Sequence, residues 1–357
     1  MFGGISRRMA AGATASAALV LATLGVPAPA AAGSTPAPYQ VTWDDFRSGF
    51  SHTGDDARWT LFPAGPLPEG DGVPTTSAAG LTVVPTGRHP VTGRPAFAFS
   101  TGQEADNGGG EADHVKWYAA ANHTSSAGYT GFDTVPGQVF GCDATISART
   151  FGTAGHPFGG AVRDPQSDPR LAAGALSVVD MESWVVFDFF ITNHQVYAYY
   201  ERLPQAGAGK AAFSYAVPVA TRTPDQWHHL AISYDRSAGV AAWQVNGREV
   251  LRVNQVGHRP VDRRHLLIDT GGADELVTPR QLSCGLATFT LLDGEAEGTG
   301  GGLVRLSSKP DHYFDPSVGF PSPQHFVDDA SRPGNRLWGQ GAQLSVRRVG
   351  VTSLPSR

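Results

Sequence analysis

The fold class that the sequence predicts is all-β, an antiparallel β-sandwich with long loops. Segments that alternate apolar and polar residues recur along the chain, and this period of two is typical of half-buried strands. The 357 residues include 44 glycines and 26 prolines, as a chain with many turns requires. The sequence shows no long amphipathic helix, coiled-coil heptad or internal repeat, which argues against helical and repeat architectures.

The N-terminal segment has the composition of an export signal. Arg7 and Arg8 precede a stretch rich in Ala, Leu and Val over residues 10–26, and Ala30-Ala31-Ala32 supplies a cleavage site. The double arginine also fits a twin-arginine signal, so the general and twin-arginine routes both remain open. We therefore expect a signal peptide over residues 1–32 and an extracellular location.

The predicted strands follow one another at short intervals, separated by loops rich in Gly, Pro, Asp and Ser. They cover residues 39–43, 81–85, 95–99, 138–149, 176–191, 196–200, 229–234, 240–245, 265–269, 287–292 and 343–351. No segment has the composition of an interdomain linker. We expect a single sandwich domain over residues 33–357, with its first and last strands paired.

Two cysteines, Cys142 and Cys284, follow the predicted cleavage site. In an oxidising compartment a disulfide between them is the simpler interpretation, and two separate buried thiols are the alternative. A bond would close a very long loop and stabilise the fold by about 2–4 kcal/mol.

The segment 178–191 is the strongest strand signal. Its odd positions are almost wholly apolar and are expected to face the core. Its even positions carry three acids and two aromatic residues on the opposite face. They are Asp180, Glu182, Trp184, Asp188 and Phe190.

A tight turn at Asn193-His194 extends this face onto the next strand. In a two-residue turn, Phe190 lies opposite Tyr197, Asp188 opposite Tyr199, and Val186 opposite Glu201. Directly opposed residues share a face. Acids on a central strand are costly unless water or partners reach them, so the pattern predicts a solvent-filled groove lined by carboxylates and aromatic rings.

Asp180-Met181-Glu182 resembles part of the active strand of laminarinase- and lichenase-type glycosidases, whose pattern is Glu-x-Asp-x-(x)-Glu. The resemblance implies that Glu182 is a catalytic acid/base and that Asp180 assists it. In the shorter form of this pattern, which lacks the residue in parentheses, the nucleophile position falls on Val178. Valine cannot attack an anomeric carbon.

Two further segments resemble the concanavalin A-like jelly-roll superfamily. Residues 227–235 and 242–250 are similar to the Trp-His and Asn-Gly run of laminin-G-like and laminarinase-like domains. The run predicts two strands joined by a turn, followed by an Asn-Gly hairpin. Lectins, lyases and hydrolases share it, so it implies the jelly-roll fold and leaves the chemistry open.

The sequence therefore predicts a secreted carbohydrate-active protein, a glycoside hydrolase that acts on a polysaccharide or oligosaccharide. The expected substrate contacts are Trp184, Asp188, Tyr197, Tyr199, Glu201, His156 and Asp269. His156 lies in the loop before the active strand, where it either faces a ligand or is an ordinary loop histidine. A second catalytic carboxylate would come from Asp188, Glu201 or Asp269.

Two alternatives remain open. Because Val178 occupies the nucleophile position, the chain can instead be a non-catalytic glycan-binding or cell-surface module. A polysaccharide lyase is the other alternative, since His194, Tyr197, Tyr199 and Arg202 are the residue types of β-elimination.

Net charge and composition limit the classes of partner and cofactor that the protein is expected to bind. A net charge of −5 gives no reason to expect nucleic acid or an anionic membrane. The 12 histidines show no zinc-binding spacing, so no catalytic metal or other cofactor is expected. The jelly-roll resemblance leaves a structural calcium possible, and we expect a monomer.

Overall fold

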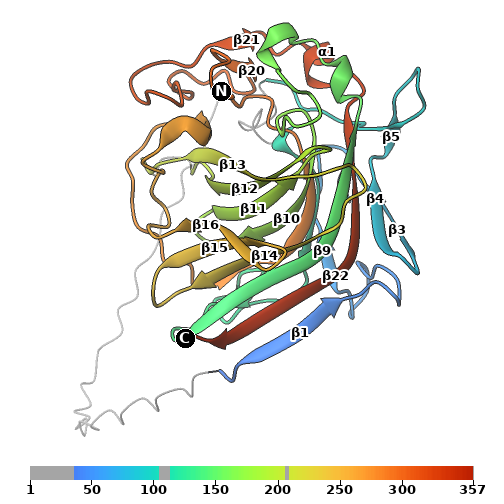
Figure 1. Ribbon diagram of the computed structural model, residues 1–357, viewed down its shortest axis with the longest axis vertical. Coiled ribbons are helices and arrows are strands. Elements are labelled where there is room, and N and C mark those ends of the chain that lie inside the picture. Colours follow the sequence, from blue (N-terminus) through green and yellow to red (C-terminus); the bar gives the residue numbers. More distant parts are fainter. Residues whose placement is uncertain (1–35, 104–112, 206–208, 357) are drawn as a thin grey trace, which may run out of the picture. The chain divides into compact units, whose positions relative to one another are not determined.

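A computed structural model describes residues 36–103, 113–205 and 209–356. Every element described below lies in one compact unit, Pro36–Arg357 (Figure 1). The predicted signal peptide, residues 1–32, lies outside the described residues. Within the described ranges, no helix has the length and apolar character that crossing a membrane requires.

Two antiparallel sheets of eight strands each form the sandwich, as the sequence predicts for a jelly roll. In the first, the β9 sheet, the order is β16-β15-β14-β9-β22-β4-β3, and β1 also pairs with β22. Its strands are β1 (Tyr39–Asp44), β3 (Val73–Ser77), β4 (Gly80–Val84), β9 (Gln138–Phe151), β14 (His228–Asp235), β15 (Val240–Val245), β16 (Arg248–Val253) and β22 (Gly341–Pro355). The expected pairing of first and last strands is confirmed, with Val41 opposite Val351.

In the second sheet, the β11 sheet, the order is β17-β13-β12-β11-β10-β19-β7-β2. Its strands are β2 (Trp59–Leu61), β7 (Val115–Ala121), β10 (Ala173–Val179), β11 (Val185–Ile191), β12 (Gln195–Arg202), β13 (Phe213–Thr221), β17 (Leu266–Asp269) and β19 (Gly285–Phe289).

Short elements occupy the connections. Three small pairs are β5 (Gly87–Arg88) with β6 (Pro95–Ala96), β8 (Phe132–Asp133) with β18 (Gln281–Leu282), and β20 (Gly302–Val304) with β21 (Phe326–Asp328). The helical turns are η2 (Thr153–Gly155), η3 (Gly159–Ala161), η4 (Arg263–His265) and α1 (Pro333–Arg336).

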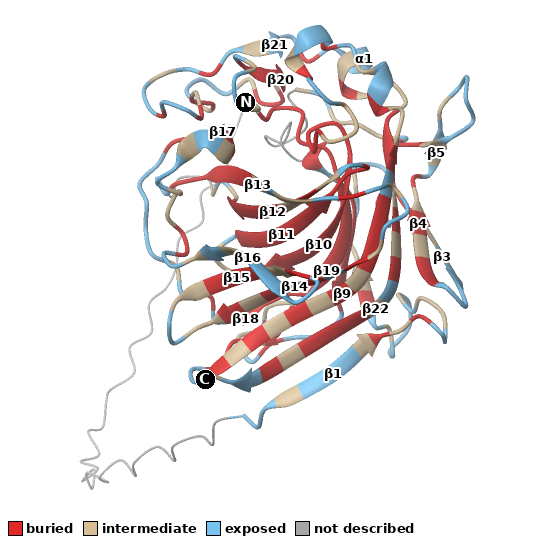
Figure 2. Cartoon of the chain, viewed as in Figure 1, coloured by how far each residue is buried: buried red, intermediate tan, exposed pale blue. Residues whose placement is uncertain are grey.

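The hydrophobic core lies between the two sheets. Alternate residues of β9 face it, as a period of two requires. They are Phe140, Cys142, Ala144, Ile146 and Ala148. Figure 2 shows a contrast between the sheets: β9 alternates between buried and less buried residues, whereas β11 is buried along its whole length. The β11 sheet is therefore covered on both faces.

A disulfide joins the sheets across the core. Cys142 of β9 and Cys284, directly before β19, are bonded, with their Cα atoms 5.7 Å apart. This confirms the expected disulfide. Because the two residues are 142 positions apart in sequence, the bond removes a large loop entropy from the unfolded chain.

The prediction of one continuous strand over 176–191 is wrong. β10 ends at Val179 and β11 begins at Val185, and a turn joins them as a hairpin. Asp180 builds this turn: its carboxylate accepts hydrogen bonds from the Glu182 backbone N–H, at 3.0 Å, and from the Ser183 hydroxyl. Aspartate commonly initiates a turn in this way, so a side chain that looked like part of a strand face ends the strand instead.

The predicted β11–β12 hairpin is confirmed. Phe190 pairs with Tyr197, Asp188 with Tyr199, and Val186 with Glu201. The backbone N–H of Thr192 donates to the carbonyl of Gln195 at 2.9 Å and closes the two-residue turn. The acids and rings of β12 consequently share the face of Asp188.

The Asn-Gly hairpin is confirmed as well. β15 and β16 meet at Asn246-Gly247, where both residues have positive φ, 52° and 81°. Glycine adopts this conformation without steric cost, and asparagine tolerates it better than most residues do.

Candidate functional site

The face of the β11 sheet that points away from the core, here called the site face, carries an unusual number of polar and aromatic groups. It includes Tyr118, Ser177, Val186, Asp188, Phe190, Tyr197, Tyr199, Glu201, Ser214, Ala216 and Phe289. Period-two alternation on β10, β11, β12 and β13 brings these side chains together.

Loops cover most of the site face. Tyr313 and Phe326, from the segment between β19 and α1, pack in one cluster with Phe190 and Tyr199. Asp188 and Tyr199 are each only 1% exposed. The predicted solvent-filled groove over these two residues is therefore wrong, because the long C-terminal loops fill that space.

Glu201 is the site-face carboxylate that keeps access to a cavity. The Tyr199 hydroxyl donates to its Oε1 at 2.7 Å, and the Ser214 hydroxyl donates to the same oxygen. Tyr199 belongs to the same strand as Glu201 and Ser214 to the neighbouring β13, and 8% of Glu201 remains exposed. The arrangement holds one oxygen firmly by two hydroxyl donors.

A cluster of three polar side chains, each from a different loop, faces Glu201. His114 Nε2 lies 2.6 Å from Asp293 Oδ1, and the Tyr313 hydroxyl donates to Asp293 Oδ2 at 2.8 Å. The imidazole and the carboxylate are both buried. Such a pair is stable only when hydrogen bonds compensate for the lost hydration, and here Asp293 receives two.

The pKa shifts of this cluster follow from burial and neighbouring charge. Burial alone would lower the pKa of His114, but the Asp293 carboxylate outweighs it and raises the value to about 9. Burial raises the pKa of the Glu201 carboxyl, which the Ser214 hydrogen bond and the His114 charge only partly offset. Burial also raises the pKa of Asp188 well above its ordinary value. At neutral pH, His114 is thus a cation beside a carboxyl that holds its proton more tightly than usual.

Two hollows lie along this part of the site face. The first, of about 50 Å³, is lined by Glu201, His114, Ser214 and Asp293 among others. The second, of about 260 Å³, lies over Tyr197 and is bordered by loops on its far side. Ser214 lines one and Ala216 the other, and these are successive residues on the same face of β13, so the hollows are adjacent.

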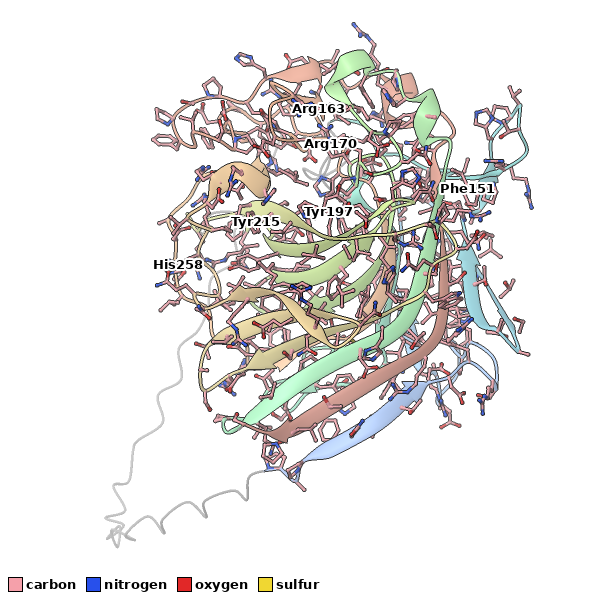
Figure 3. The ribbon with its side chains drawn as sticks, viewed as in Figure 1. Phe151, Arg163, Arg170, Tyr197, Tyr215 and His258 are labelled. Carbon is pink, nitrogen blue, oxygen red and sulfur yellow. A yellow bond between two sulfur atoms is a disulfide. The ribbon has the colours of Figure 1, made fainter. Side chains whose placement is uncertain are left out.

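The second hollow is bordered by a fixed loop. The Tyr197 hydroxyl donates to the carbonyl of Ser167 at 2.9 Å, and Arg170 is paired with Asp168 at 2.6 Å. Figure 3 shows Tyr197, Arg170 and Arg163 one after another, from the strands toward the upper loops. Arg163 is exposed and donates to the carbonyl of Gly298 at 2.9 Å, so it reaches across from one loop to the next.

Comparison with protein families assigns most of the chain to one family. A family model described as a family of unknown function, DUF6081, matches residues 43–355. The chain belongs to the DUF6081 family.

Individual relatives of the DUF6081 chain are distant. It is 29% identical over 222 residues to uncharacterized protein L829 of Acanthamoeba polyphaga mimivirus, covering 46% of this chain and 49% of the relative. The chain thus spans about half the length of the curated relative that it matches.

Similar solved structures include two glucanases. The endo-β-1,3-glucanase from Pyrococcus furiosus is 13% identical with a TM-score of 0.42, over 89% of this chain and 94% of the glucanase. The endo-1,3-β-glucanase from Streptomyces sioyaensis is 12% identical with a TM-score of 0.39, over 93% and 100% respectively. The activities named are those of the two glucanases.

The structure places Asp180 and Glu182 in the β10–β11 turn at the end of the sheet, separate from the Glu201 cluster. Asp180 is buried and also accepts a hydrogen bond from the Gln281 amide at 2.6 Å. Glu182 forms a two-pronged ion pair with Arg280, at 2.6 and 2.7 Å. Both carboxylates of the expected catalytic pair therefore have structural partners, and the expectation that they share a strand face is not met.

Trp184 lies in the same turn of the DUF6081 chain. It is 40% exposed, and its φ of +60° is a strained conformation for a bulky side chain. The structure thus keeps an aromatic ring accessible at the end of the sheet, at a conformational cost.

The remaining expected contacts lie apart from the cluster. Asp269 is 1% exposed and is paired with Arg259 at 2.9 Å and with Arg263 at 2.5 Å. His156 follows η2 and stacks on Phe158, with ring centroids 6.0 Å apart. Burial lowers the pKa of His156.

Sequence reasoning missed His114, Asp293, Tyr313 and Ser214. The first three come from loops separated by up to about half the chain, so no local spacing marks them. Within the described residues, no group of three or more His, Cys, Asp or Glu is arranged to hold a metal ion.

Proposed function

We propose that this DUF6081 protein is a secreted carbohydrate-active protein that binds a saccharide over β12 and β13 and hydrolyses it with Glu201 as the proton donor. The observation that carries the proposal is the geometry of Glu201. It is a carboxyl held by Tyr199 and Ser214 at the wall of a cavity, with a raised pKa. The inter-sheet disulfide supports an oxidising, extracellular compartment.

The raised pKa suits a general acid. A carboxyl that keeps its proton toward neutral pH can donate it to the bridging oxygen as the bond from C1 to that oxygen breaks. Water then adds to C1, and the proton that it releases restores Glu201. The His114 cation lies beside this carboxyl and stabilises its ionised form after proton transfer.

The neighbouring groups supply binding surface. The hollow over Tyr197, of about 260 Å³, continues from the Glu201 cavity along β13 and extends the surface available to a ligand. The Tyr197 ring at its floor is suited to a sugar face. Asp188, diagonal to Glu201 on the adjacent strand, is the second carboxylate of the site face.

The test is glycan turnover with paired variants. Reducing-end release across a panel of glycans, with ultraviolet absorbance to detect unsaturated lyase products, should reveal the substrate. Glu201→Gln should lower turnover by at least about 100-fold, the usual contribution of a positioned acid, while leaving binding largely intact.

Glu182→Gln is the matched control, because it makes the same change at the position that the glycosidase resemblance selects. We expect it to retain turnover. Loss of turnover in Glu182→Gln together with full activity in Glu201→Gln would refute the assignment to Glu201.

A second function, non-catalytic glycan binding, is favoured by Trp184. An exposed aromatic ring in a strained conformation is a suitable stacking surface for a sugar. This function predicts binding with no product, abolished in Trp184→Ala. Product formation on any glycan of the panel would exclude it.

A further inference from the structure

A separate groove, here called the outer groove, opens on the other sheet. Its volume is about 700 Å³, within the range of sites for small ligands. Phe151 and Arg149 of β9 line its floor, the β5–β6 hairpin with Arg94 forms one wall, and the β11–β12 turn closes one end. Figure 3 shows Phe151 near the upper end of β9, beside the strands that carry this hairpin.

The side chains on the floor point away from the core. Ala148 and the even positions before it face the core, so the odd positions Arg149 and Phe151 face outward. Arg149 is exposed and Phe151 is half-buried. The Phe151 ring and the Arg149 guanidinium both point away from the core and are therefore available to a ligand.

The wall formed by the β5–β6 hairpin is fixed to the sheet. The backbone N–H of Phe97 donates to the carbonyl of Gln340 at 2.8 Å. A Cβ added at Gly341 would lie 2.9 Å from the Cα of Ala96, so the hairpin sits directly on β22. His89 Nδ1 accepts the backbone N–H of Val91 at 3.1 Å and holds the hairpin tip in shape.

The closed end is equally rigid. The Asn193 side chain accepts the backbone N–H of Thr150 at 2.8 Å and donates to the Gln166 side chain at 2.6 Å. The Trp338 indole donates to the carbonyl of Gly152 at 3.1 Å. The groove is thus a preformed hollow and needs little ordering when a ligand binds.

The outer groove is cationic although the chain is acidic overall. Arg94 is exposed, and among the described residues its guanidinium has no hydrogen-bond or ion-pair partner. Arg149 pairs only with the exposed Asp225, and such a surface pair contributes little, so its guanidinium can exchange partners. Asp225 is the one carboxylate among the residues that line this groove and its continuation, against two arginines.

A smaller hollow of about 260 Å³ continues the outer groove across the sheet and shares Arg149 with it. Trp227 and Gln343 line this continuation. The Arg347 guanidinium lies 4.1 Å from the centre of the Trp227 ring and adds a third cation nearby. Aromatic rings, an amide and arginines therefore follow one another along a single path.

We propose that the outer groove is a binding site for a carboxylate-bearing oligosaccharide, a chain of uronic acid residues. Phe151 provides a stacking surface for a sugar ring, and Arg94 and Arg149 pair with the sugar carboxylates. The choice of a saccharide rests on the proposed function, whereas the choice of an anionic ligand rests on the groove alone. The site lies on the sheet opposite Glu201, so it anchors a chain without taking part in its cleavage.

The test is calorimetric titration of the full chain with a short oligouronate and with a neutral oligoglucoside of equal length. Arg94→Gln and Phe151→Ala should each weaken oligouronate binding by about tenfold or more, as expected for a lost charge-assisted or stacking contact. Arg248→Gln is the matched control, since Arg248 is an exposed arginine on β16, at the far edge of the same sheet. It should bind as the native chain does.

Three results would overturn the inference: no oligouronate binding, equal binding of the neutral sugar, or equal binding of polyglutamate of the same charge. Binding that Arg94→Gln leaves unchanged would overturn it too. Because Arg94 is exposed, this variant should fold even if Phe151→Ala does not. Glycan turnover and oligouronate binding measured side by side in the native chain separate the two proposals: turnover without oligouronate binding refutes the outer groove alone, and oligouronate binding without turnover refutes hydrolysis alone.

Discussion

The buried His114–Asp293 pair makes the stability of the fold depend on pH in a specific window. The folded protein raises the pKa of His114 from 6.5 to about 9. Because the folded state binds this proton more tightly than the unfolded state, the stabilisation is complete below about pH 6.5 and is lost as pH rises through about 9.

The magnitude follows from the two values. Each pH unit between 6.5 and about 9 corresponds to about 1.36 kcal/mol, so the loss of unfolding free energy amounts to about 3 kcal/mol. His114→Gln removes the titration while keeping a donor toward Asp293. We expect the variant to show a smaller fall in unfolding free energy than the native chain across this window.

The assay is urea unfolding followed by tryptophan fluorescence at pH values from 6 to 10. Asp188 and Glu201 also have raised pKa values, and burial makes the folded protein lose stability when they ionise. Both remain in the variant, so the difference between the two curves reports the His114 titration together with its charge coupling to Glu201. Parallel curves for the native chain and His114→Gln, or a titration of the His114 ring near pH 6.5 by NMR, would refute the reasoning.

Three further predictions concern stability and can be checked by thermal or urea unfolding. Replacing Cys142 and Cys284 together by serine should lower the free energy of unfolding by about 2–4 kcal/mol, and an unchanged melting temperature would contradict this. Gly174→Ala places a Cβ 2.8 Å from both Ala148 Cβ and Leu344 Cδ1, so overpacking should cost about 1–3 kcal/mol, and a neutral effect would mean that the core yields freely. Gly247→Ala should cost about 1 kcal/mol, because its φ of +81° disfavours a side chain, while Gly334→Ala in open space serves as the comparison.

The parts of the fold that were predictable are those with a local cause. The β11–β12 register followed from alternation and a two-residue turn, since a slip of one residue would turn the apolar side chains of Phe187 and Phe189 to the other face. The Asn246-Gly247 hairpin followed from the φ that these residues tolerate.

Several strands of the two sheets escaped prediction, among them β2, β3, β7 and β13, and the last two did so for identifiable reasons. In β7, Lys116 interrupts the apolar run and argues against a buried strand. The lysine is nevertheless buried, because it forms an ion pair with Asp113 at 2.8 Å. In β13, Pro218 argues against a strand, yet it lies at a shift in register opposite Tyr197, where a missing N–H is tolerated.

The β10–β11 turn was misread for a similar reason. Asp180 and Trp184 continue the alternation of the flanking strands, so nothing in the pattern marks the chain reversal. The decisive contacts are the hydrogen bonds of the Asp180 carboxylate and the positive φ of Trp184, which the sequence does not encode through a glycine or proline. Asp180 and Glu182, the acids that resembled an active strand, therefore lie in a turn and not on the site face. Glu201 lies on the site face, as its position in β12 predicts.

The class of fold, the faces of β11 and β12 and the chemistry available on them follow from the sequence alone, because alternation and turn residues act over a few positions. Which of those groups line a cavity depends on how distant parts of the chain pack together. His114, Asp293 and Tyr313 come from distant loops, and their meeting beside Glu201 depends on how these loops pack over the sheet. Burial and mutual charge, which set the protonation of this cluster, are properties of that packing and not of any local segment.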